Sequence, residues 1–137
     1  MLALDNGRVA TLALLPIDQV VSPYWTGQFY SENTNLGILA WRGQVAESVS
    51  GAKNARLLGN IGSRDALGGF VRINDWNQYE IIARGGVFIH IINGQLMAVY
   101  IDDDPTSSNN VSGLIGIEME GTPSKTSVRN IWLRKLK

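Results

Sequence analysis

The sequence predicts an all-β domain whose strands pack as a sandwich of two sheets. Short runs rich in Val, Ile, Leu and aromatic residues are separated by clusters of Gly, Asn, Asp and Ser, which is typical of antiparallel β proteins. Two apolar runs are joined by Asn93 and Gly94, a pair that favours the tight turn of a β-hairpin. Because a single sheet would leave one apolar face in water, we expect two layers of strands. The length of 137 residues predicts one domain, over residues 1–137.

The first part of the chain is expected to hold three strands. Residues 9–17 form an almost continuous apolar run that ends near a proline and an aspartate, as in a strand buried on both faces. Residues 25–30 and 37–41 are the second and third expected strands. The polar residues 31–35 between them are turn formers.

The middle and the end of the chain complete the expected set of elements. Residues 50–67 show no alternation, so we expect a long connection with a short helical turn over 63–67. Tight turns after it predict an antiparallel meander of three strands, Tyr79–Arg84, Val87–Ile92 and Gln95–Ile101. A polar loop over 102–110 and further strands over 114–120 and 127–136 follow.

Strand alternation predicts how side chains divide between the two faces of the meander. On its second strand, one face holds Phe88, His90 and Ile92, and the other holds Val87, Ile89 and Ile91. One face of this strand is therefore wholly apolar and the other contains a polar group. A sandwich in which one sheet carries the function would show this pattern.

Composition excludes several classes of function. Lys plus Arg total 12, Asp plus Glu total 12, and the pI is near 6.6, so neither nucleic acid nor an anionic membrane surface is an expected partner. No apolar run is long enough to span a bilayer, and the first residues lack the basic region of a secretory signal. These residues do not indicate a cellular location. The absence of Cys excludes thiolate chemistry, and a single histidine excludes a zinc site built on two imidazoles.

Motifs along the whole chain resemble those of a known family. In order, they are YWTGQFY at 24–30, GILAWRG at 37–43, WNQYEIIARG at 76–85, HIING at 90–94, DDDP at 102–105 and VRNIWL at 128–133. Together they resemble the 3-keto-disaccharide hydrolase domain, long a bacterial domain of unknown function. The resemblance covers about residues 9–136.

The resemblance implies an antiparallel jelly-roll β-sandwich of the concanavalin A-like lectin and glucanase type. Family members begin several strands earlier, so this chain corresponds to the C-terminal two-thirds of the domain and is expected to be N-terminally incomplete. A sandwich without its first strands would expose unpaired edges. We therefore expect either self-association or a native chain with a further N-terminal segment. The family's late strand also carries a histidine where this chain has Glu118, Met119 and Glu120.

The resemblance further implies cleavage of glycosides that are oxidised at C3. Such a site needs a base, a group that stabilises an enolate oxygen and an acid for the leaving oxygen. His90, the only imidazole, suits the base, and Arg42 or Arg84 could hold the oxyanion. Glu118 or Glu120 could donate the proton. A divalent metal ion could replace the arginine as electrophile.

Each of these residues also has a structural interpretation. Asp102 and Asp103 would be among the oxygen ligands of such a metal ion, although a run of aspartates is also typical of a solvated loop. Trp25, Trp41 and Tyr30 could stack on a sugar or could belong to the core. The histidine could be a core residue, and the two late-strand glutamates could pair with Lys or Arg across strands. Two functions therefore stay open: a hydrolase or lyase of 3-keto-glycosides, and a non-catalytic carbohydrate-binding or structural module.

Overall fold

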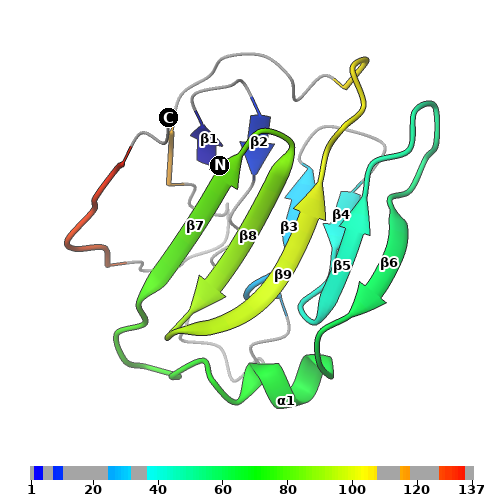
Figure 1. Ribbon diagram of the computed structural model, residues 1–137. Coiled ribbons are helices and arrows are strands. Elements are labelled where there is room, and N and C mark those ends of the chain that lie inside the picture. The colour runs from blue at the N-terminus through cyan, green and yellow to red at the C-terminus, as the bar shows by residue number, and fades with distance from the viewer. Residues whose placement is uncertain are drawn as a thin grey trace.

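The computed structural model describes residues 2–4, 8–10, 25–31, 37–107, 115–117 and 127–134 (Figure 1). Over these residues the protein is mostly β, as predicted, with a single short helix. The elements are β1 (Leu2–Leu4), β2 (Arg8–Ala10), β3 (Phe29–Ser31), β4 (Gly37–Ala40), β5 (Gln44–Glu47), β6 (Arg56–Asn60), α1 (Arg64–Gly68), β7 (Tyr79–Arg84), β8 (Val87–Ile92) and β9 (Gln95–Ile101). No helix among them is long and apolar enough to cross a bilayer.

A five-stranded sheet dominates the described part of the chain. Its strand order is β6-β5-β9-β8-β7, so that β7 and β6 lie at opposite edges (Figure 1). The β7-β8-β9 meander has the three strands that the turn chemistry predicts. Asn93 and Gly94 both have positive φ, 51° and 79°, as a type I′ turn requires. The sheet is mixed, because β5 runs parallel to β9.

The tip of the β8–β9 hairpin is fastened to the loop that precedes β7. The Asn93 amide donates to the Phe70 carbonyl (2.7 Å) and to Asn77 Oδ1 (2.8 Å), and its oxygen accepts from the Gln78 amide (3.0 Å). Asn77 in turn bonds to the main chain of Arg72 in both directions. Asn93 therefore both forms the turn and fixes the position of the neighbouring loop.

The β3–β4 hairpin packs against one face of the large sheet and forms a second layer. Phe29, Leu39 and Ala40 from this hairpin share a core with residues of the sheet, namely Ala46, Phe88, Ala98 and Tyr100. The predicted division of β8 is confirmed, since Phe88, His90 and Ile92 are buried and the alternate residues are partly exposed. The face that contains the histidine is the one that points into the core.

The first predicted strands are confirmed only in part. Strand β2 overlaps the beginning of the predicted strand 9–17, whose residues after 10 lie outside the described part. Residues 25–28 form a turn instead of a strand, because Gly27 has a φ of 85°, and the strand begins at Phe29. The β4 strand is confirmed.

The predicted connection over 50–67 is wrong in its middle part, residues 56–60. Strand β6 lies within it and pairs with β5, which was not predicted either. The helical turn is confirmed as α1, where Ser63 Oγ accepts the Ala66 amide at 3.1 Å as an N-cap.

The late strands also differ from prediction. Residues 127–134 form no strand, which corrects the strand predicted over 127–136; all are exposed, and Trp132 is 90% exposed. No described strand lies beside them to complete a ladder of hydrogen bonds. Of the strand predicted over 114–120, Ile115 makes an isolated bridge, and residues 118–120 lie outside the described part.

Candidate functional site

His90 lies at the centre of β8 and is enclosed on every side. Its exposed fraction is 0%. The Phe29 ring stacks on the imidazole with centroids 3.6 Å apart, and the Tyr79 hydroxyl lies 3.0 Å from Nδ1. No hydrogen bond reaches Nε2 from the described residues. The histidine that the sequence proposes as a base is thus a core residue in this conformation.

Burial also sets the charge of this pair. It lowers the pKa of His90 to about 3, although the main-chain carbonyl groups of Gln28 and Gly27 favour the charged ring. Burial likewise raises the pKa of the Tyr79 hydroxyl. Both groups are therefore neutral at pH 7, and the Tyr79 hydroxyl can donate to Nδ1. An imidazole with this pKa is a weak base while it stays enclosed.

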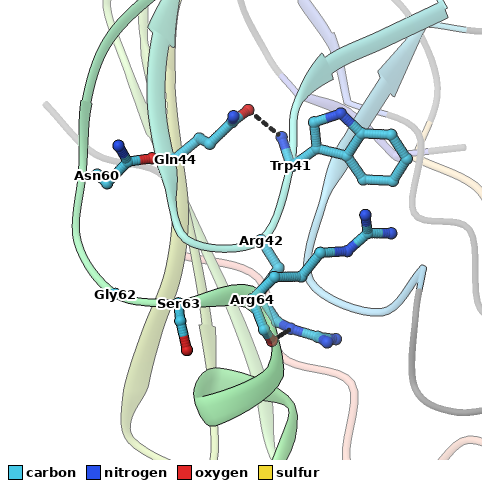
Figure 2. A pocket seen from close by; sticks show the side chains of 7 residues that line it. All are labelled: Trp41, Arg42, Gln44, Asn60, Gly62, Ser63 and Arg64. Carbon is cyan, nitrogen blue, oxygen red and sulfur yellow. Dashed lines mark hydrogen bonds between the residues drawn. The ribbon is translucent and has the colours of Figure 1, made fainter.

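A cavity of about 590 Å³ opens at the end of the sheet where α1 begins (Figure 2). Two short segments line it, the β4–β5 turn and the chain between β6 and α1. Its lining residues are Trp41, Arg42, Gln44, Asn60, Gly62, Ser63 and Arg64. The lining offers cationic, amide and hydroxyl groups and an indole, but neither a carboxylate nor an imidazole.

One main-chain hydrogen bond joins the two segments, and another fastens the β4–β5 turn to β9. The Ile61 amide donates to the Gly43 carbonyl (2.8 Å), and the Gly43 amide donates to the Met97 carbonyl (2.6 Å). A side chain at position 43, where φ is 93°, would collide with the carbonyl oxygen of Gly62. Glycine is therefore required for the close approach that shapes the cavity.

Arg42 is buried, and its guanidinium group links the segments around the cavity through hydrogen bonds. Its Nε donates to the Arg64 carbonyl (2.7 Å) and its Nη1 to the Thr26 carbonyl (2.9 Å). Burial lowers the pKa of Arg42, the Arg64 charge lowers it further, and Asp65 opposes both. The Arg42 guanidinium nevertheless stays charged, as arginine does throughout proteins.

Two tryptophans form an aromatic surface beside the cavity. The rings of Trp25 and Trp41 stack with centroids 5.4 Å apart and planes 30° from parallel. The Arg64 guanidinium lies 3.8 Å from the Trp41 centroid and 6.0 Å from that of Trp25, so it contacts both rings. Figure 2 shows the Arg64 side chain extending beside the Trp41 indole. An indole face next to hydrogen-bonding groups is the combination that binds the apolar face and the hydroxyls of a sugar.

The other predicted site residues lie elsewhere. Arg84 is exposed at the end of β7, and Tyr30 is half-buried on β3, opposite Ile38. Asp102 and Asp103 follow β9, at the opposite end of the sheet from α1 (Figure 1). Glu118 and Glu120 lie outside the described residues.

The two aspartates do not fit a metal site. Asp102 is buried and accepts a hydrogen bond from Ser107 Oγ (3.0 Å), while Asp103 is exposed. No group of three or more acidic or imidazole side chains converges within the described part of the chain. We therefore derive no chemical step through a metal ion at this end of the sheet.

The structure thus brings together Trp25, Trp41 and Arg42 from the predicted set. Sequence reasoning missed Arg64, Gln44 and Asn60. The last two residues carry no motif, and the arginine lies in a stretch that shows no periodicity. In the segment between β6 and α1, the N-cap Ser63 is the one residue whose type gives a recognisable structural signal in the sequence.

Comparison with known proteins supplies the family. Residues 13–134 match the model of the 3-keto-alpha-glucoside-1,2-lyase-like domain. This match covers most of the chain and confirms the resemblance carried by the sequence motifs. No curated protein and no solved structure matches the chain.

Proposed function

The chain belongs to the 3-keto-alpha-glucoside-1,2-lyase-like family, and from this membership we propose that it cleaves glycosides oxidised at C3. The proposed fold is the concanavalin A-like jelly roll that the family resemblance implies, over a single domain of residues 1–137. The two packed layers of strands support that topology.

The chemistry of a 3-keto-glycoside makes elimination the natural reaction. The ketone at C3 acidifies the hydrogen at C2, so a base can remove that proton and leave an enolate. Collapse of the enolate breaks the bond from C1 to the glycosidic oxygen, and the departing oxygen takes a proton from an acid. Addition of water to the resulting double bond then gives the free 3-keto sugar. The protein must supply the base, the acid and a cation for the enolate oxygen.

The Trp25–Trp41 surface is the observation that supports substrate binding at the cavity beside α1. A pyranose stacked on an indole would have its hydroxyls within reach of the Gln44 and Asn60 amides. A ketone or enolate oxygen in the cavity would meet the Arg64 guanidinium. Arg42 is buried and bonded to the Arg64 and Thr26 carbonyls, so it would contribute its positive charge from beneath the cavity. For the sugar to stack on Trp41, the Arg64 side chain would need to move off the ring.

The proton-transfer roles are proposed on chemical grounds. His90 stays the candidate base, and it would need Phe29 to move before a substrate could reach the ring. Glu118 or Glu120 keeps the proposed role of acid for the leaving oxygen. Arg84 lies at the other end of the sheet from the cavity, so we assign the oxyanion to Arg64 instead, with the buried Arg42 adding positive charge beneath it.

Release of 3-keto-glucose from a 3-keto-disaccharide tests the proposal. We expect Trp41→Ala to lose most of the activity, and Trp132→Ala, whose side chain is 90% exposed, to keep it. His90→Gln removes the base without adding charge and should abolish turnover while leaving binding intact. A wild-type protein that releases no product, or a Trp41→Ala protein as active as wild type, would overturn the proposal.

A second function is favoured by the enclosure of His90 and by the lack of an acid or base in the cavity lining. These two observations fit a carbohydrate-binding module that does not catalyse. In that case the 3-keto-disaccharide binds and is recovered unchanged.

A further inference from the structure

Among the described strands, β7 forms one edge of the large sheet and is paired on one side only. Within the described residues β7 pairs only with β8, and no strand lies on its other side (Figure 1). The β7–β8 register is continuous, whereas a bulge interrupts the pairing of β6, the opposite edge, with β5. Strand β7 also lacks the proline and the lysine that commonly block edge pairing.

The outward-facing residues of β7 carry complementary charges at its two ends. Glu80, Ile82 and Arg84 lie opposite Ile91, Ile89 and Val87 of β8, on the face that points away from the core. Glu80 and Arg84 are exposed, and neither makes an ion pair with another described residue. They lie four strand residues apart, about 13 Å, which is too far for them to pair within one copy.

Symmetry limits how two copies of β7 could pair. In an antiparallel pair of strands, two residues that face each other either both direct their N–H and C=O groups toward the other strand or both direct them away. The two kinds of residue pair alternate along each strand. Under a two-fold axis, opposed residue numbers must therefore differ by an even number. Two such registers overlap the strand equally, over five residues each: one centres on Ile81 and the other on Ile82. Charge complementarity favours the register about Ile82. It places Glu80 opposite Arg84 of the second copy and Arg84 opposite the second copy's Glu80.

We propose that β7 is a homodimer interface, at which two copies pair antiparallel about Ile82 and join their sheets. The register forms two Glu80–Arg84 pairs and one contact between the two Ile82 side chains. It also brings the half-exposed Ile82 and Ile89 side chains of both copies into one continuous apolar row across the joined sheets. The partner is thus a second copy of this chain. The interface is independent of the proposed sugar cavity.

Charge reversal at the two positions tests both the dimer and its register. We expect light scattering after size exclusion to show a dimer for wild type at tens of micromolar. Glu80→Arg alone and Arg84→Glu alone each place like charges opposite one another twice. Each should therefore raise the dissociation constant at least about tenfold. Lys53→Glu makes the same charge change as Arg84→Glu in an exposed loop and should leave the dimer unchanged.

Two further samples, in which opposite charges face each other again, make the test specific. The double variant Glu80→Arg/Arg84→Glu should dimerise again, because every pair is again of opposite charge. An equimolar mixture of the two single variants should form a heterodimer. A monomeric wild type, single variants that dimerise like wild type, or a double variant that stays monomeric would overturn the proposal. Circular dichroism of each variant separates lost dimerisation from lost folding.

Discussion

The enclosed histidine makes the stability of this protein depend on pH in a calculable way. His90 is the only histidine of the chain, and burial lowers its pKa from 6.5 to about 3 in the folded state. The unfolded chain therefore binds a proton below pH 6.5 that the folded protein does not bind. Stability from this group is complete above pH 6.5 and is lost as the pH falls toward 3.

The size of the effect follows from the two pKa values. Between pH 7 and pH 5 the free energy of unfolding should fall by about 2 kcal/mol, because each pH unit below 6.5 costs about 1.4 kcal/mol. Carboxylates add little above pH 5, since their unfolded pKa values lie near 4. Below pH 5 they contribute as well. A hydrogen bond from the Thr106 side chain, for example, lowers the pKa of Asp104.

Urea unfolding at pH 7, 6 and 5, at one protein concentration, measures this dependence. His90→Gln cannot titrate, so its free energy of unfolding should change by less than about 0.5 kcal/mol over the same range. The absolute stability of the variant does not matter, because only the two slopes are compared. A wild-type stability that is flat from pH 7 to 5, or an equal fall in the variant, would refute the buried neutral imidazole.

Two further predictions concern glycine and asparagine positions that shape the fold. Asn93→Ala should lower the free energy of unfolding by about 2–3 kcal/mol in urea titrations, because it removes three side-chain hydrogen bonds. Asn93→Gly should cost about 1 kcal/mol less, because glycine adopts the positive φ without strain; equal losses would argue against that strain. Gly43→Ala should destabilise by about 2–4 kcal/mol and weaken sugar binding measured by calorimetry. Wild-type stability in that variant would contradict the close approach to Gly62.

Turn and cap chemistry explains which parts of the fold the sequence predicts well. The meander is predictable because Asn93 and Gly94 specify their own turn, and the helical turn because Ser63 caps it. Both signals lie within a few residues of the structure that they determine. Strand β5, by contrast, pairs with β9 more than fifty positions later in the chain. Such pairing depends on contacts that no local pattern records.

The site was harder to predict than the fold for a related reason. Alternation along β8 divides its side chains between two faces, but both faces are largely apolar. The sequence therefore cannot tell whether the face that contains His90 or the opposite face packs into the core. The aromatic surface combines Trp25, Trp41 and Arg64 from three separate segments. The family motifs indicate the two tryptophans but not the arginine that covers them. Only the packed structure brings these side chains together.

Binding of a 3-keto-disaccharide at the Trp25–Trp41 surface is the central claim, and the four tryptophans of the chain offer a direct test. Each indole N–H gives its own proton–nitrogen NMR signal, which can be assigned by single substitutions and followed during a titration with the sugar. We expect the signals of Trp25 and Trp41 to shift with one saturating dissociation constant. The signals of Trp76 and Trp132, which belong neither to the cavity lining nor to the stacked Trp25–Trp41 pair, should stay in place. Shifts confined to those two, or no shift at all, would contradict a sugar site beside α1.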